Sequence, residues 1–447
     1  MSPSATFIFY YLPTSSYALN VLLGALEGAG LDQIARIKLV RRQRELHETI
    51  AAERAEGRIV YVVWSFFSAT FGMAARHLDE VHQDGVVINI AGGVHASAEP
   101  LQTLQAGFDF VATGEGEETI IAIVRAGLEG RALRGLAGLN WLEDGAMRSG
   151  PPAARVALDD HPPFANRTGR INPIEITRGC IYACRFCQTP FMFKARFRHR
   201  SIENIATYVA AMRARNMRDL RFISPTALSY GSDDESVNLD AIETLLARCR
   251  EIMGEERHVF FGSFPSEMRP EHVSPEALAL IRKYCNNDNI VIGAQSGSDR
   301  VLAEARRGHG TEAVERAVRY VIEAGYIAYV DFIFGLPGET EDDAMLSIAF
   351  AERLAGLGAD IHAHTFMPLP GTPFRDAPAG RLSPALQKTM RRLIGKGELF
   401  GQWEKQIAIA EERAAQQAAA RAGRKRIAGV AYLPSSSQVS ISQREME

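Results

Sequence analysis

The fold of this chain is constrained most by an alternation of strand-length apolar runs with amphipathic helical segments. One run, Ile59–Trp64, is almost entirely apolar, as expected of a parallel strand that is buried on both faces. This alternation predicts a doubly wound, Rossmann-like parallel α/β sheet over residues 1–140. The strands are predicted at Thr6–Leu12, Ile34–Val40, Ile59–Trp64, Val86–Ala91 and Phe108–Ala112, with helices at Tyr17–Ala29, Arg42–Glu56, Ala69–Gln83 and Glu117–Leu128.

A second alternation of strands and helices begins near Ile171, after a proline-rich stretch. Residues 141–172 are predicted to be a linker, with a small hairpin at about Leu139–Arg148. Six further strand–helix units predict a partial (β/α)6 barrel over residues 173–375. A helical extension over 376–430 and a disordered tail over 431–447 are expected to follow. The six strands are predicted at Ile174–Thr177, Leu220–Ile223, Val259–Ser263, Ile290–Ala294, Ile327–Phe334 and Asp360–Met367.

The composition argues against several classes of function. Hydrophobic residues make up 46% and charged residues 23% of the 447 residues, which is typical of a soluble globular protein. The net charge of −3 gives no field that would attract nucleic acid in general. No apolar run approaches the ~20 residues that a membrane helix needs, and the N-terminus has no secretory signal pattern. A reducing cytoplasm is therefore the expected location.

Three cysteines in a C-x3-C-x2-C spacing, Cys180, Cys184 and Cys187, follow the strand predicted at Ile174–Thr177. Three thiolates this close can bind one face of a metal cluster and leave a coordination position open for a cofactor or substrate. Loops after barrel strands are where such folds place their active sites. A zinc site completed by His199, or three buried thiols, are the alternatives; with five cysteines in all, a disulfide framework is disfavoured.

At these cysteines the sequence resembles the radical S-adenosylmethionine (SAM) superfamily. The resemblance implies a metal-binding site in which the three cysteines hold a [4Fe–4S] cluster, and SAM binds the fourth iron through its amino and carboxyl groups. Reductive cleavage of SAM would then yield a 5′-deoxyadenosyl radical. The resemblance also places Phe186, which precedes the third cysteine, near the adenine. It implies an external electron donor such as flavodoxin or ferredoxin.

Further SAM contacts are expected after two other barrel strands. Glu267 and the pair Gln295–Ser296 each follow a predicted strand, and these segments resemble SAM-contacting segments of the superfamily. So do Gly335-Leu-Pro-Gly-Glu-Thr and the segment that begins at Met367. From the residues alone, Glu267 could instead pair with Arg269, and Gln295 could satisfy buried barrel backbone.

Glycine-rich segments also follow strands of the first domain, where a backbone can approach a ligand closely. Alone they are equally consistent with tight strand–helix turns. Together they resemble the cobalamin-binding (B12-binding) domain that precedes many radical SAM barrels, except that the Asp-x-His-x-x-Gly motif is missing after the first strand. The resemblance assigns the cobalamin site to Ser65, Gly92, Gly93, His95, Gly114 and Glu115, without a motif-supplied histidine below cobalt.

The first hypothesis for function is therefore a radical SAM transferase of the B12-binding class. In that reading the enzyme methylates an unactivated carbon of a small-molecule substrate, with cobalamin as the methyl carrier. Three alternatives stay open: a cyclase, coupling or rearrangement enzyme without cobalamin, a methylthiotransferase, and a non-enzymatic cobalamin or iron–sulfur sensor. The methylthiotransferase is disfavoured because the sequence lacks an N-terminal cysteine triplet for a second cluster.

Overall fold

The N-terminal domain is built on a seven-stranded sheet with the order β2-β1-β3-β4-β5-β6-β7. The computed structural model describes residues 5–82, 86–194 and 196–412. Strands β1 to β5 are parallel, and each lies within a few residues of its predicted position. The strands are β1 (Ala5–Tyr10), β2 (Arg36–Val40), β3 (Ile59–Ser65), β4 (Ile88–Gly92), β5 (Phe110–Ala112), β6 (Leu139–Glu143) and β7 (Ala146–Ser149).

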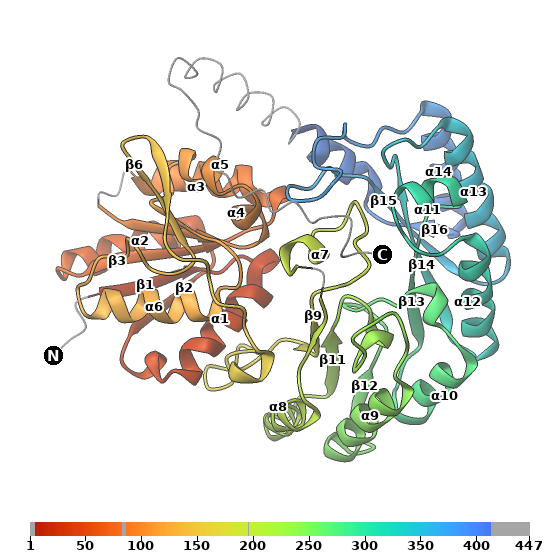
Figure 1. Cartoon of the computed structure of the whole chain (residues 1–447), viewed down its shortest axis with the longest axis horizontal. Helices are drawn as coiled ribbons and strands as arrows, with labels where there is room; N and C mark the ends of the chain where they lie inside the picture. The colour runs from red at the N-terminus through yellow and green to blue at the C-terminus, as the bar shows by residue number, and fades with distance from the viewer. Residues whose placement is uncertain (1–4, 83–85, 195, 413–447) are drawn as a thin grey trace.

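Helices cover both faces of this sheet because alternate side chains of each strand point to opposite sides. Phe7 and Phe9 of β1 pack in one apolar cluster with helices α1 and α6, whereas Ile8 packs in another with α2 and α3. Both faces are therefore buried, and the domain is doubly wound as predicted (Figure 1). The helices are α1 (Ser16–Gly28), α2 (Gln43–Ala55), α3 (Phe71–Val81), α4 (Val94–Ala98), α5 (Pro100–Gln105) and α6 (Glu117–Leu128).

The predicted hairpin belongs to this sheet and not to the linker. Strand β6 pairs antiparallel with β5, and β7 pairs antiparallel with β6. The N-terminal sheet thus extends to Ser149, beyond the boundary predicted at residue 140.

The second domain forms a partial barrel, as predicted, and its described residues supply seven parallel strands: the six predicted ones and β16. They fall into two arcs, with the orders β12-β11-β8 and β13-β14-β15-β16. The arcs are connected by a parallel bridge between Met268, in the segment that follows β12, and Ile292 of β13. The barrel strands are β8 (Ile174–Glu175), β11 (Asp219–Ile223), β12 (His258–Phe260), β13 (Asn289–Gln295), β14 (Ile327–Phe334), β15 (Asp360–Thr365) and β16 (Leu399–Phe400).

The segment predicted as a helical extension also contributes a strand. Helix α14 (Pro384–Lys396) is followed by β16, which pairs parallel with β15 and lengthens the barrel sheet. Residues 403–412 are again helical, and Trp403 is buried in the barrel core. Part of the predicted extension, 413–430, and the tail predicted at 431–447 lie outside the described residues.

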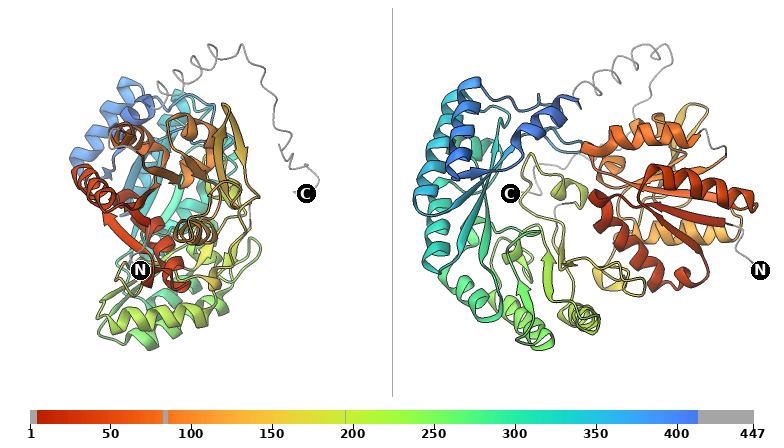
Figure 2. Two further views of the ribbon diagram at one scale, coloured as in Figure 1. Left: turned by 90° about the vertical axis from the view of Figure 1, so that its left-hand side faces the viewer. Right: turned by 180° about the vertical axis from the view of Figure 1, so that it is seen from behind.

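The two domains face each other across the loop that carries the cysteines (Figures 1 and 2). The barrel helices lie on the outer side of the arc of strands, and the N-terminal domain lies opposite its inner side. The short helix α7 (Thr189–Met192) sits between the two domains. The remaining barrel helices are α8 (Ile202–Ala214), α9 (Leu239–Met253), α10 (Pro275–Tyr284), α11 (Asp299–Glu304), α12 (Thr311–Glu323) and α13 (Glu341–Gly356).

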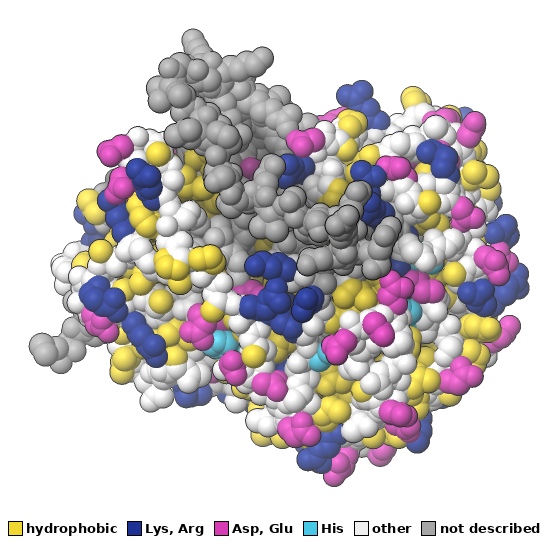
Figure 3. Space-filling model, viewed as in Figure 1, with side chains coloured by type: hydrophobic (Ala, Val, Ile, Leu, Met, Phe, Trp, Pro, Cys, Tyr) yellow, Lys and Arg dark blue, Asp and Glu magenta, His cyan; other side chains and the backbone are white. Residues whose placement is uncertain are grey.

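Acidic and basic side chains are interspersed over most of the face shown in Figure 3. This mixture agrees with the small net charge of −3. Among the described residues, no helix is long and apolar enough to cross a membrane.

Candidate functional site

The cysteine loop runs from Gly179 to Phe197 between two short paired strands, β9 (Thr177–Arg178) and β10 (Arg198–His199). Gly179 has φ +87°, and a Cβ there would lie 1.9 Å from the carbonyl oxygen of Arg196. Only glycine fits this close approach of the two loop ends. The loop therefore closes on itself directly before Cys180.

All three cysteines line one cavity of about 310 Å³. Two buried arginines lie beside Cys184: Nη1 of Arg307 is 3.5 Å and Nη1 of Arg269 is 3.9 Å from its Sγ. Burial raises the pKa of Cys180 to about 12 and also raises the pKa of Cys187. Neutral thiols are thus favoured without a metal, while the two guanidinium groups favour thiolate sulfur. This donor set fits the three-cysteine iron–sulfur site that the sequence predicts.

A second cavity of about 290 Å³ adjoins the first, and the two share Phe186, Glu267 and Asp331 as lining residues. Gln295 lines the second cavity at the end of β13, where a bulge shifts the strand register and its own φ is +75°. A Cβ on Gly293 would lie 2.8 Å from Gln295 Nε2 and 3.1 Å from Glu267 Oε2. These side chains therefore converge beside the cysteines, and burial raises the pKa of Glu267.

Ser296 is placed differently from the other predicted SAM residues. Its side chain is fully buried, and its hydroxyl lies 3.1 Å from the hydroxyl of Ser347 in α13. It also accepts a hydrogen bond from the backbone N–H of Ser298. Ser296 lines neither cavity, so the structure gives it a role in packing strand β13 against α13.

Sequence reasoning missed a polar cluster inside the barrel. Asp331 of β14 lies 2.8 Å from Nδ1 of His362 and 3.8 Å from Nε2 of His364, both in β15. Burial favours the neutral acid, but the hydrogen bonds from the two histidines outweigh it and lower the pKa of Asp331. Polar residues at every second position of an apolar strand are the signal that would have revealed this cluster.

Donor atoms of these three residues lie within 4.8 Å of one another, a spacing that a metal ion could bridge. The hydrogen bonds argue against a metal. Gln406 accepts from the Thr365 N–H at 2.7 Å, and its amide N–H therefore faces Nδ1 of His364 at 3.0 Å. The neutral ring then carries its proton on Nε2 and has no lone pair there for a metal. The cluster therefore consists of the Asp331 carboxylate and the two histidines beside it, and Asp331 and His364 line the second cavity.

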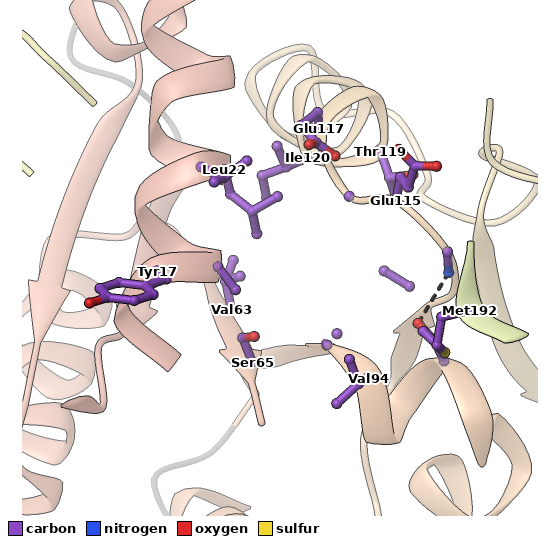
Figure 4. Close-up of a pocket in the computed structure, with 18 of the residues that line it drawn as sticks. Tyr17, Leu22, Val63, Ser65, Val94, Glu115, Glu117, Thr119, Ile120 and Met192 are labelled. Carbon is purple, nitrogen blue, oxygen red and sulfur yellow. Dashed lines mark hydrogen bonds between the residues drawn. The ribbon is translucent and has the colours of Figure 1, made fainter. Parts of the chain in front are cut away.

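The N-terminal domain borders a third cavity, of about 360 Å³, which both domains line (Figure 4). In Figure 4, Leu22, Val63, Ile120 and Met192 surround its open centre. Helix α7 separates this cavity from the cysteine cavity, because Thr189 lines one and Met192 the other. The structure brings five of the predicted cobalamin residues to this cavity: Ser65, Gly92, Gly93, Gly114 and Glu115.

Two observations bear on whether cobalamin fits this cavity. A Cβ on Gly93 would lie 2.9 Å from the Phe66 carbonyl oxygen and 3.0 Å from Ser65 Oγ, so the glycine leaves the wall clear for a ligand. None of the described residues that line the cavity is a histidine. The residues present therefore fit a cobalamin without a histidine ligand from this cavity.

His95 does not line this cavity, contrary to the prediction from sequence. It is buried on helix α4, its Nδ1 lies 2.9 Å from Ser68 Oγ, and its ring stacks on Phe71 at 4.2 Å. His95 therefore belongs to the packing of the domain.

Glu115 lines the cavity but is also held in a cluster of buried charges between the domains. Arg178 binds Glu115 at 2.8 Å, and Glu117 and Glu175 at 2.7 Å each. Burial favours the neutral form of Glu115, but hydrogen bonds and charge from Arg198 and Arg178 outweigh it and lower its pKa. Local sequence patterns could not have predicted these contacts, because Arg178 and Arg198 lie 63 and 83 positions along the chain from Glu115.

Comparison with known proteins agrees with this geometry. Residues 174–351 match the radical SAM superfamily, and residues 8–124 match the B12 binding domain. The chain therefore combines a radical SAM domain with a B12-binding domain.

Solved structures of radical SAM proteins share this architecture. The methyltransferase TsrM from Kitasatospora setae, solved with cobalamin and a [4Fe–4S] cluster, superposes with a TM-score of 0.64 at 18% identity, over 84% of this chain and 74% of that chain. The cobalamin-dependent enzyme OxsB superposes with a TM-score of 0.61 at 18% identity, over 78% of this chain and 52% of that chain. At these identities the likeness establishes the fold.

Sequence relatives of the chain include tRNA-2-methylthio-N(6)-dimethylallyladenosine synthases. The protein from Leptothrix cholodnii is 29% identical over 51% of this chain and 48% of its own length. The protein from Magnetococcus marinus is 33% identical over 49% of each chain. The chain thus spans about half the length of these curated relatives.

Proposed function

We propose that this protein is a radical SAM enzyme that binds a [4Fe–4S] cluster, SAM and cobalamin, and transfers a methyl group to an unactivated carbon of a small molecule. The observation that carries the proposal is the pair of neighbouring cavities on either side of helix α7. One contains the three cysteines and the other is bordered by the glycine-rich strand ends of the B12-binding domain. Helix α7 (Thr189–Met192) lies between them, since Thr189 lines the cavity with the cysteines and Met192 lines the other.

Each cavity has a separate task in this proposal. When bound, the cluster supplies the electron for SAM cleavage, and cobalamin supplies a carrier for the methyl group. Cys180, Cys184 and Cys187 would hold the cluster, with Arg307 and Arg269 stabilising thiolate charge at Cys184. Phe186, Glu267 and Gln295 would contact SAM in the two joined cavities. A small-molecule substrate is inferred by analogy with TsrM, which was solved with tryptophan as substrate.

The B12-binding domain would hold cobalamin through close backbone contacts. Gly93 and Gly114, both with positive φ, keep Cβ atoms out of the cavity wall, and Ser65 presents a hydroxyl beside Gly93. The apolar side chains of Leu22, Val63 and Ile120 would exclude water from the ligand. Electrons would come from a small redox protein such as flavodoxin or ferredoxin in a reducing cytoplasm.

The experiment that tests the proposal is anaerobic purification and cluster reconstitution, followed by an inventory of cofactors. We expect one [4Fe–4S] cluster per chain, 5′-deoxyadenosine or S-adenosylhomocysteine on reduction with SAM, and cobalamin bound in equimolar amount. Cys184→Ala is the matched variant and should lose iron and SAM cleavage while it still binds cobalamin. A wild-type protein that binds iron and SAM but no added cobalamin would instead favour a cyclase, coupling or rearrangement enzyme.

A methylthiotransferase is the second candidate, because the curated relatives of the chain include tRNA methylthio-synthases. Two observations argue for the first candidate. Residues 8–124 match a B12 binding domain, and only two cysteines, Cys249 and Cys285, remain outside the triplet, fewer than the three that a second cluster of this kind would need. Incubation of the reconstituted protein with tRNA that carries N(6)-dimethylallyladenosine separates the candidates, since insertion of a methylthio group into that nucleoside would identify the second.

A further inference from the structure

The two ends of the cysteine loop bind the same carboxylate of the other domain. Arg178 and Arg198 lie directly opposite each other in the β9–β10 pair, one just before the loop and one just after it. Arg178 Nη1 donates to Oε2 of Glu115 at 2.8 Å. Arg198 donates to both carboxylate oxygens of Glu115, at 2.7 Å and 2.9 Å. Glu115 itself lies between β5 and α6 of the B12-binding domain.

These contacts are shielded from water. The side chains of Glu115 and Arg178 are 9% and 8% exposed, and that of Arg198 is 16% exposed. Charged hydrogen bonds of this kind are short, directional and costly to leave unmade in a buried place. The geometry of the loop ends is therefore set by the position of Glu115.

The two arginines depend on Glu115 to different degrees. Arg178 also binds Glu117 and Glu175, so it keeps two carboxylates if Glu115 is neutralised. Arg198 otherwise donates to the carbonyl oxygen of Val156 at 2.5 Å. Loss of the Glu115 charge would thus release the end of the cysteine loop at Arg198 more than the end at Arg178.

We propose that Glu115 is a positioning residue for the cysteine site, which it holds from the neighbouring domain. It fastens both ends of the loop that carries Cys180, Cys184 and Cys187, and it also lines the cavity between the domains. A ligand in that cavity and the geometry of the cysteines are therefore energetically coupled, and the coupling acts equally in both directions. This inference deepens the proposed function, because it rests on the cysteine loop being the cluster site.

The test compares Glu115→Gln with Glu27→Gln, a matched control. Glu27 is also a buried carboxylate of the N-terminal domain, 7% exposed, and it accepts hydrogen bonds from the backbone N–H groups of Arg167 and Thr168 in the linker. It therefore ties the same domain to the rest of the chain without binding an end of the cysteine loop. Arg198→Met is a milder second variant that releases one loop end and keeps the Glu115–Arg178 pair.

The first readout is amide hydrogen exchange of residues 179–194 in cluster-free protein, which requires no cofactor. We expect exchange in Glu115→Gln to be about ten-fold faster or more, with an intermediate effect in Arg198→Met and less than about two-fold in Glu27→Gln. The second readout is the electron paramagnetic resonance (EPR) signal of the reduced cluster before and after SAM is added. SAM cleavage in Glu115→Gln should fall roughly 10- to 100-fold, as expected when a reacting centre is misplaced by about 1 Å.

The outcomes separate this inference from the proposed function. Equal exchange in Glu115→Gln and Glu27→Gln would overturn the positioning role, whether or not a cluster assembles. A wild-type protein that assembles no cluster would overturn the proposed function, while faster exchange in Glu115→Gln alone would still support the link between Glu115 and the loop.

Discussion

Replacing Gly93 with alanine is the most direct test of the N-terminal cavity. Gly93 has φ +92° and ψ −179°, a region of backbone conformation that is essentially restricted to glycine. A Cβ there would lie 2.9 Å from the Phe66 carbonyl oxygen and 3.0 Å from both the Phe66 nitrogen and Ser65 Oγ. Two of these atoms belong to the backbone of the loop after β3, so the clash cannot be relieved by rotating a side chain.

The expected cost follows from these two effects. A non-glycine residue in this backbone region costs about 1–3 kcal/mol, and overpacking against fixed neighbours costs about 1–3 kcal/mol more. Gly93→Ala should therefore lower the free energy of unfolding of the N-terminal domain by about 2–6 kcal/mol. It should also weaken cobalamin binding, because the strain displaces the wall formed by Ser65 and Phe66.

Gly92→Ala is the matched control. Gly92 lines the same cavity, but a Cβ there would lie 3.8 Å from its nearest neighbour, the Trp64 carbonyl oxygen, which is ordinary contact. Urea unfolding of cofactor-free protein and equilibrium binding of cobalamin are the measurements. Gly92→Ala should change stability by no more than about 1 kcal/mol. The reasoning is refuted if both variants unfold at the same urea concentration.

Three further results are expected. Alanine at any one of the three loop cysteines should abolish the iron–sulfur absorption, whereas Cys249→Ala should retain it, because Cys249 is buried in helix α9; a full spectrum in a loop variant would contradict the assignment. Burial raises the pKa of Glu339 to about 7, so the unfolded chain ionises first and stability should fall as pH rises from 4.5 to 7. In Glu339→Gln the free energy of unfolding should fall by roughly 3 kcal/mol less over this pH range, as measured by urea midpoints at each pH. The same pH dependence in wild type and variant would contradict this expectation. The Co(II) EPR spectrum of bound cobalamin should be the same in the wild type and in His95→Ala, because His95 contacts Ser68 inside the domain and does not bind cobalt. Loss of a nitrogen splitting in His95→Ala would contradict this.

Local periodicity was enough to predict most of the fold. The five parallel strands of the first domain and the six predicted barrel strands follow apolar runs that can be recognised from neighbouring residues alone. The hairpin β6–β7 was assigned to the linker because its place is decided by pairing with β5, which is a non-local contact. Strand β16 was missed because Leu399–Phe400 is too short to show a period.

Site residues that directly follow strand ends could be predicted from the sequence. Site residues whose direction depends on a local irregularity of the backbone could not. Cys180, Phe186 and Glu267 meet because the carboxyl ends of parallel strands converge at one edge of a sheet. Ser296 turns away because the bulge at the end of β13 changes which side chains point inward. Asp331 and His364 were open to prediction, since both are polar residues on the inward face of apolar strands.

The order of these elements along the chain bears on how the protein is made. The sheet of the N-terminal domain is finished at Ser149, whereas the cysteine loop begins thirty positions later, at Gly179. Domains generally fold as units during synthesis, the N-terminal one first. Glu115 would then already be in place when the loop leaves the ribosome, so the earlier domain can serve as a template on which the nascent cysteines are arranged before metal is delivered to them.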